Sequence, residues 1–266
     1  MICLRSPLES NVSLSILSPG IVPEIKAVTR FPAQVCSGAD AKIPSIIYYD
    51  QDGSVRSVGA EALHEDTLER AEDEDWIRCE WFKLHLRPNG KGDGTVSQAI
   101  PPPLPLKKTA VAVLADFLRY LMRCVQKFII QSMYNGLSFW ESVEDRIQFI
   151  LPHPNDWEDP QKSQMRRAAV QAGLITGSTQ DCDRVQFVTE GEAILHFCLN
   201  NGYNTSIGRI VVVNAGSDTV DLSAYQGTNN DQPKFEGIAK PLCRFTGSML
   251  VTIQARQYLQ SISGRF

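Results

Sequence analysis

The sequence predicts an α/β fold in which strands and helices alternate along the chain and pack in layers. Its clearest element is a helix over Lys108–Tyr134, because apolar residues recur there at spacings of three and four. These residues are Leu114, Phe117, Leu118, Leu121, Val125, Phe128 and Ile129. An apolar strand, Ile147–Leu151, follows this helix, and two further strands flank a tight turn at Gly216.

The N-terminal part of the chain is expected to be rich in strands. Apolar and β-branched runs bounded by turn residues predict strands at Ser13–Leu17, Ile25–Val28, Ile43–Tyr49 and Val55–Val58. The last two flank Asp50-Gln51-Asp52-Gly53, whose turn chemistry predicts a hairpin. The acidic segment Ala60–Trp76 is helix-prone and is expected to present a solvated face.

Helices and strands are expected to alternate again beyond a Gly/Pro-rich connector over Pro88–Pro105. The helices are expected at Glu158–Ala172, at Glu190–Leu199 and from about Ser248 to Leu259. The strands are expected at Val185–Val188, on both sides of Gly216 and at Phe235–Ile238, with a polar loop over Gln226–Gln232.

Composition excludes several classes of protein. A net charge of −4 over 266 residues offers no basic surface for nucleic acid. No apolar run reaches the roughly 18 residues of a membrane span, and the N-terminus lacks the apolar core of a signal peptide. We therefore expect a cytoplasmic protein without a membrane partner. The seven cysteines have no CxxC spacing, which indicates reduced, mostly buried thiols, and the four histidines have no metal-ligand spacing.

The segment from Val211 to Tyr225 carries the strongest functional signal. It predicts a strand, a turn at Gly216 and a second strand, and small residues at such a turn allow backbone N–H groups to converge on a phosphate. Gly216 and Thr219 are the candidate phosphate contacts. An ordinary hairpin turn is the alternative interpretation of the same residues.

This segment resembles the second phosphate loop, Asp-x-Gly-Gly-Gly-Thr-x-Asp, of the actin/hexokinase/heat-shock ATPase superfamily. The resemblance is to the heat shock protein 70 family, and within it to the diverged members seen in fungi. Three positions depart from the pattern, since Asn214 replaces the first aspartate and Ser217 and Asp218 replace the second and third glycines. Further segments resemble other parts of the same domain, in chain order Ala41–Ser45, Val58–Ala62, Cys79–Lys83, Ile150–Trp157, Phe187–Ala193 and Leu242–Leu259.

The resemblance implies an actin-like ATPase (ribonuclease H-like) lobe over residues 1–203 and the beginning of a second lobe over residues 204–266. The family's first phosphate loop, Asp-x-Gly-Thr-Thr, has no counterpart, because Pro7-Leu8-Glu9-Ser10-Asn11 stands in its place. The later adenosine-binding segment and the substrate-binding domain have no counterpart before Phe266. We therefore expect a nucleotide-binding domain that is damaged at its N-terminus and truncated at its C-terminus.

The resemblance also assigns roles to particular residues. Lys83 would neutralise charge on the phosphates, and Glu190 would orient water or a metal ion. An exposed lysine and an acidic residue favoured by a helix N-terminus are the alternative interpretations of these two residues. The residues expected to bind the cofactor, ATP or ADP with magnesium, are Asn214, Gly216, Ser217, Asp218, Thr219 and Gly247. No direct protein ligand of the metal is assigned.

Two substitutions in the loop predict weak hydrolysis. Asn214 carries no charge and cannot act as a base. Asp218 places a carboxylate near the expected phosphates, and two unit charges ~4 Å apart repel by about 4 kcal/mol at an effective dielectric near 20. The leading hypothesis is thus a heat-shock-70-like ATP-binding domain with an impaired role in ATP-dependent protein folding. The alternative is a non-catalytic pseudo-ATPase or truncated remnant that acts at most as an interaction module. A small-molecule kinase of the same superfamily would need a substrate-binding carboxylate for which no motif stands out.

Overall fold

The computed structural model describes residues 2–5, 9–17, 20, 24–29, 31–34, 42–87, 102–200, 208–217, 219–228, 234–244 and 246–263. These residues fall into two compact units. The first unit takes its described residues from Met1–Arg87, Pro101–Leu151 and Asp159–Phe187, and the second from Pro152–Glu158 and Val188–Phe266. Both units mix strands with helices, as the sequence predicts.

A mixed sheet organises the first unit. Its strands follow the order β3-β2-β1-β8-β9, and β4 also pairs with β2. Cys3 pairs with Ser13 in the antiparallel contact of β1 with β2 and with Ile150 in the parallel contact of β1 with β8. The strands are β1 (Ile2–Arg5), β2 (Glu9–Ser15), β3 (Ile25–Ala27), β4 (Lys42–Pro44), β8 (Phe149–His153) and β9 (Val185–Thr189). The strand β1 was not predicted from the sequence. The strand β2 was predicted to start at Ser13 and starts at Glu9, because the polar residues Glu9–Asn11 lack the apolar pattern of a strand.

A second sheet of the first unit has the order β6-β5-β7. It consists of β5 (Ile46–Tyr49), β6 (Val55–Val58) and β7 (Ile77–Glu80). The predicted hairpin is confirmed, and Asp50 closes its turn by accepting the backbone amides of Asp52 and Ser54. The expected single strand Ile43–Tyr49 is wrong, since Ser45 separates β4 from β5 and the two pair in different sheets.

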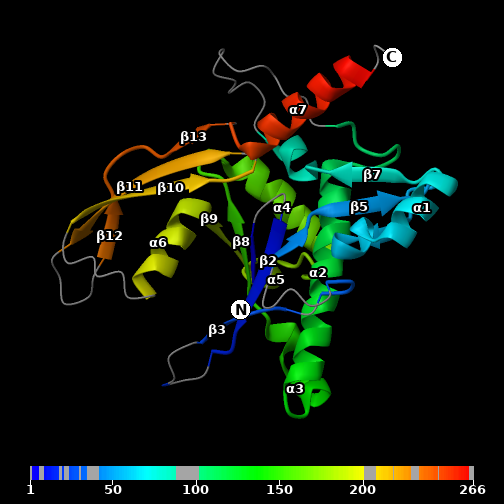
Figure 1. The fold of residues 1–266 in the computed structure, drawn as a ribbon. Coiled ribbons are helices and arrows are strands. Elements are labelled where there is room, and N and C mark those ends of the chain that lie inside the picture. The colour runs from blue at the N-terminus through cyan, green and yellow to red at the C-terminus, as the bar shows by residue number, and fades with distance from the viewer. Residues whose placement is uncertain are drawn as a thin grey trace. The chain divides into compact units, whose positions relative to one another are not determined.

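Helices cover these strands. The predicted helix over Lys108–Tyr134 is confirmed as α2 (Ala110–Ser132), which packs against α4 (Figure 1). Thr109 caps its start by accepting the Ala112 amide. The acidic segment is a 3₁₀ turn, η1 (Gly59–Leu63), followed by α1 (Glu65–Asp73). The remaining helical elements of this unit are η2 (Phe82–Leu86), α3 (Gly136–Val143), η3 (Glu144–Arg146), α4 (Asp159–Ala172) and α5 (Thr179–Cys182).

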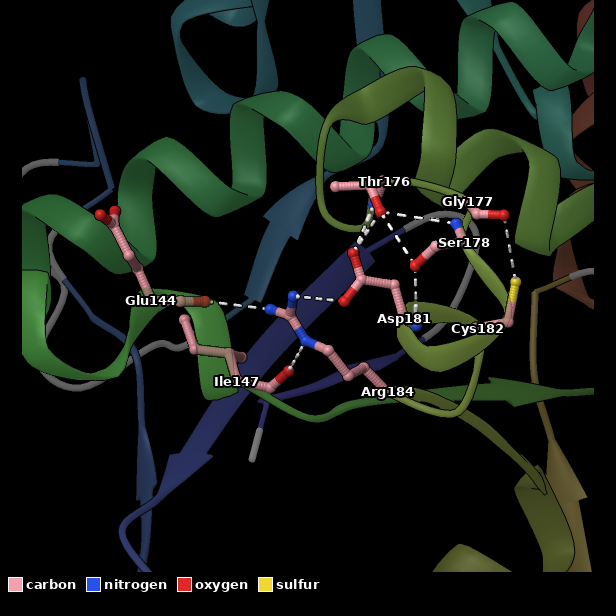
Figure 2. Close-up of polar contacts among 8 residues, drawn as sticks. All are labelled: Glu144, Ile147, Thr176, Gly177, Ser178, Asp181, Cys182 and Arg184. Carbon is pink, nitrogen blue, oxygen red and sulfur yellow. Dashed lines mark hydrogen bonds and ion pairs between the residues drawn. The ribbon is translucent and has the colours of Figure 1, made fainter.

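Arg184 fastens the connection between α5 and β9 to the segment before β8 (Figure 2). Its guanidinium donates to the carbonyls of Ile147 at 2.9 Å and Glu144 at 3.0 Å, and to the Asp181 carboxylate at 3.2 Å. Asp181 in turn accepts the backbone amide and hydroxyl of Thr176. One planar side chain thereby satisfies two loop carbonyls and a carboxylate, which fixes the β8 and β9 ends next to each other.

The second unit is built on an antiparallel sheet with the order β10-β11-β12, in which β13 also pairs with β11. Helix α6 lies along the β10–β11 hairpin (Figure 1). The elements are α6 (Glu190–Asn200), β10 (Arg209–Ala215), β11 (Val220–Thr228), β12 (Lys234–Gly237), β13 (Leu242–Arg244) and α7 (Ser248–Ser263). The expected polar loop over Gln226–Gln232 is wrong at its start, because Gln226 pairs with Glu236 and extends β11.

The two faces of this hairpin differ sharply. Val212 of β10 and Asp221 and Ser223 of β11 are buried, whereas Val211 is 65% and Val213 57% exposed.

Among the described residues, no helix is long and apolar enough to cross a membrane. Five cysteines have side chains that the structure describes, and all of them are free thiols: Cys79, Cys124, Cys182, Cys198 and Cys243.

Candidate functional site

The buried face of the β10–β11 hairpin brings Glu190 and Asn214 together. Glu190 is the first residue of α6, and Asn214 is the last but one of β10. The Asn214 amide donates to Glu190 Oε2 over 2.7 Å, a short distance typical of hydrogen bonds to a carboxylate. Glu190 is 5% exposed, so this contact fastens the start of α6 to the hairpin in a poorly hydrated place.

Asp221 is a second carboxylate on the same face, directly across the hairpin from Asn214. It is 1% exposed, and both of its oxygens accept hydrogen bonds. Oδ1 accepts the backbone amide of Asn155 at 3.0 Å, and Oδ2 accepts the Thr219 hydroxyl at 2.6 Å. Thr219, itself buried, therefore uses its hydroxyl to hold Asp221.

The loop that follows β8 completes this face of the hairpin. The side-chain amide of Asn155 donates to Ser223 Oγ at 3.0 Å and lies 3.4 Å from the Leu222 carbonyl oxygen. Gly191 approaches the same serine so closely that a β-carbon at residue 191 would stand 2.6 Å from Ser223 Oγ. A larger residue at position 191 would therefore force the Ser223 hydroxyl to move from the place where it accepts the Asn155 amide, and glycine at this position leaves α6 close to β11 with Glu190 against Asn214.

The tip of the hairpin contacts the start of α7. The Gly216 amide closes the turn by donating to the Thr219 carbonyl at 2.9 Å. The amides of Ser248 and Met249 donate to the carbonyls of Gly216 and Ser217, at 3.3 and 2.8 Å. These first amides of α7 lack partners within the helix, so the hairpin tip satisfies them. Gly247, which directly precedes α7, is brought to the turn by these two bonds.

Most of the predicted site residues therefore meet in the second unit. They are Glu190, Asn214, Gly216, Ser217, Thr219 and Gly247. Lys83 belongs to the first unit, where it lies in η2 between the buried side chains of Phe82 and Leu84. Asp218 lies outside the described residues. The roles proposed for all of these residues stay predictions.

Sequence reasoning missed four residues of this cluster, namely Asn155, Gly191, Asp221 and Ser223. Asp221 is the last aspartate of the loop pattern, so its position in the motif could have revealed it. Asn155, Gly191 and Ser223 carry no such signal, because their contacts join segments far apart in the chain. Cys243 of β13 also adjoins the cluster, and burial, with the nearby Asp221 and Asp156 carboxylates, raises the pKa of its thiol above the usual range.

The carboxylate oxygens of Glu190 and Asp221 do not fit the role of ligands for a resident magnesium ion. Magnesium in proteins is held by one or two carboxylates together with water and phosphate oxygens. Here Glu190 already accepts a hydrogen bond from Asn214, and both oxygens of Asp221 accept hydrogen bonds within the protein. Within the part of the chain that the structure describes, no group of three or more His, Cys, Asp or Glu residues is placed to hold a metal ion.

The described residues thus form a mixed α/β structure in which a strand–turn–strand loop has an acidic helix start beside it. The chain shows distant homology to heat-shock-70 proteins, which are of the actin-like ATPase type. It is 28% identical to human "Heat shock 70 kDa protein 12A" over 194 residues, which are 71% of this chain. The identity is 27% with the mouse protein of that name over 194 residues, and 27% with human "Heat shock 70 kDa protein 12B" over 162 residues. No family model matches the chain.

The homology covers only part of these relatives. The aligned regions are 27% of the length of the 12A proteins and 22% of the 12B protein, so the chain spans about a quarter of the relatives it matches. At this distance the homology supports a nucleotide-binding domain of the heat-shock-70 type, and nucleotide binding with a metal ion is a property of that family in general.

Proposed function

We propose that the chain forms part of an ATP- or ADP-binding domain in which the β10–β11 turn receives phosphate groups. The observation that carries this proposal is the meeting of three separate motifs at one turn. Glu190 reaches Asn214, and the residues after Gly247 bind the carbonyls of Gly216 and Ser217. An isolated hairpin requires none of these contacts, so their coincidence favours a binding loop over an ordinary turn.

The residues of the turn have distinct roles in this proposal. The turn places Gly216 and Ser217 beside the phosphate groups, while the Gly216 amide itself closes the turn by donating to the Thr219 carbonyl, and the Thr219 hydroxyl holds the carboxylate of Asp221 by a hydrogen bond. Lys83, in η2 of the first unit, is the proposed cation that neutralises phosphate charge. The family role that follows is ATP-dependent protein folding, which we extend to this chain only as a proposal.

We propose binding with little hydrolysis. Asn214 is an amide and cannot take a proton from water, and Glu190 already accepts the Asn214 amide. Phosphoryl transfer depends on well-placed charges. The amide at residue 214 lacks one such charge, and its hydrogen bond engages the carboxylate of Glu190, which keeps its own charge. ATP should therefore stay largely intact in the presence of the folded protein.

A protein-interaction module without nucleotide turnover is the second candidate function. The outer face of β10 exposes Val211 and Val213, and α7 exposes Val251, Tyr258 and Leu259 at 63% or more. Contiguous apolar surface is typical of contacts with other proteins, and Val211 and Val213, two residues apart on one strand, stand on the same face of β10. Nucleotide binding distinguishes the two candidate functions, because the ATP- or ADP-binding domain requires it and the interaction module does not.

Titration calorimetry with ATP tests the proposed site when three proteins are compared. Ser217→Glu adds a negative charge at the turn, and Gln226→Glu adds the same charge at the far end of the same hairpin. A unit charge ~5 Å from a phosphate costs about 3 kcal/mol at an effective dielectric near 20, before screening by salt. We expect saturable binding by the wild type, at least a tenfold loss in Ser217→Glu and little change in Gln226→Glu. Equal affinities in all three proteins would place the nucleotide elsewhere.

A further inference from the structure

Asn214 and Glu190 form an amide–carboxylate pair inside the proposed phosphate site. The amide nitrogen lies 2.7 Å from Glu190 Oε2, and the pair joins two elements whose residues are 24 positions apart. An amide binds a carboxylate only through its NH₂ group, because its carbonyl oxygen has no proton to donate. Glu190 thus already has a donor, and that donor carries no charge of its own.

An aspartate at residue 214 would create a different situation. Two carboxylates at the same 2.7 Å separation cannot both stay ionised without a counter-charge, so they would take up a cation or a proton between them. The amide removes this requirement, since the pair then holds at most one negative charge and has its own hydrogen bond.

Among the described residues of the hairpin, Asp221 is the one carboxylate, and it offers no alternative. Both oxygens of Asp221 are occupied, by the Asn155 amide at 3.0 Å and the Thr219 hydroxyl at 2.6 Å. Because the side chain is only 1% exposed, an ion would have to break these bonds to reach it. Binding magnesium directly or through ordered water requires carboxylate oxygens that are open to the ion.

From these contacts we infer that the site binds nucleotide phosphates without a divalent cation, because the Asn214 amide replaces the metal ion as the partner of Glu190. The inference rests on the proposed function and specifies its ligand, the free nucleotide rather than its magnesium complex. It also specifies what a single substitution does, since Asn214→Asp restores the demand for a cation.

The first test compares the affinity of the wild type for ATP in excess magnesium and in EDTA. We expect the two dissociation constants to agree within about threefold. A loss of tenfold or more on chelation would overturn the inference. Absence of binding in both buffers by a folded sample would contradict the proposed function instead, and the second test then decides the inference alone.

The second test uses manganese without nucleotide, with thermal unfolding as the measurement. A ligand that binds only the folded state raises the unfolding midpoint. At about 1 mM manganese, we expect a rise of several degrees for Asn214→Asp and no rise for the wild type. An equal rise in both proteins would overturn the inference. So would the absence of a rise in folded Asn214→Asp at every pH from about 6 to 9, because a cation must replace any shared proton as pH rises. If Asn214→Asp unfolds in EDTA, we expect the fold to recover when manganese is added. Failure of the fold to recover would overturn the inference.

A double substitution provides the matched control. Glu190→Gln combined with Asn214→Asp exchanges donor and acceptor, so the pair keeps one carboxylate and one amide. We expect this protein to fold and to gain no stability from manganese. If manganese stabilises it as strongly as it stabilises Asn214→Asp, the amide does not replace the cation and the inference is wrong.

Discussion

Gly191 at the start of α6 lies so close to Ser223 of β11 that any β-carbon at residue 191 would displace the Ser223 hydroxyl. A β-carbon at residue 191 would stand 2.6 Å from Ser223 Oγ and 3.3 Å from its Cβ. This contact sets how closely α6 approaches the hairpin, and with it the reach of Glu190 to Asn214. The geometry of the site therefore depends on a residue that performs no chemistry.

Gly191→Ala should destabilise the protein for this reason. Overpacking of this kind costs about 1–3 kcal/mol, of which the better helix propensity of alanine recovers up to about 1 kcal/mol. Gly237→Ala in β12 is the control, because nothing lies within 4 Å of a β-carbon there. Denaturant unfolding should show a lower midpoint for Gly191→Ala only. Equal midpoints for the two variants would mean that α6 does not pack this closely on β11.

Replacing Arg184 should loosen the β8–β9 region. Arg184→Lys keeps the charge but cannot reach the carbonyls of Glu144 and Ile147 and the Asp181 carboxylate together. Leaving these groups without partners should lower the free energy of unfolding by about 2 kcal/mol. Arg56→Lys, at an ion pair with Asp50 in which the arginine side chain is 45% exposed, should cost less than about 0.5 kcal/mol. If urea unfolding shows that Arg184→Lys and Arg56→Lys lose similar amounts of unfolding free energy, the role of the Arg184 network is contradicted.

Acid should destabilise the protein partly through Asp181. Hydrogen bonds from the Thr176 hydroxyl and amide, and then from Arg184, hold the pKa of this carboxyl below its ordinary value of 3.8. A lowered folded-state pKa means that the stability is present above pH 3.8 and is lost as pH falls through the folded-state pKa. Asp181→Asn should therefore flatten the loss of stability below about pH 4. An acid profile of Asp181→Asn as steep as that of the wild type, measured by denaturant unfolding at a series of pH values, would contradict this role of Asp181.

Two buried thiols should resist alkylation in the native protein. Burial raises the pKa of Cys79 to about 12 and that of Cys124 to about 11, and a raised pKa leaves little thiolate at neutral pH. Mass spectrometry after brief treatment with iodoacetamide should find both residues unmodified, and labelled once the protein is unfolded in urea. Rapid native labelling of either residue would show that the first unit opens at that place.

Local patterns predicted the elements with strong periodicity, and α2 is the clearest case because its stripe of apolar residues matches the helical repeat. Local sequence patterns did not predict strands that form only through pairing with a strand far away in the sequence. Leu242–Arg244 forms β13 only because β11 lies beside it, and three residues carry no pattern of their own. The candidate site shows the same limit, since Asn155 and Asp221 meet across 66 residues of sequence.

Hydrogen–deuterium exchange with and without ATP tests the central claim most directly, because it reports both whether nucleotide binds and where. The account predicts slower exchange in peptides covering Ile210–Thr219, with smaller effects at the starts of α6 and α7, which contact that hairpin. The β6–β5–β7 sheet, whose strands pair only with one another among the described residues, should stay unchanged. Protection absent from the β10–β11 turn, at ATP concentrations that saturate heat-shock-70 proteins, would contradict the assignment of this turn as the phosphate site.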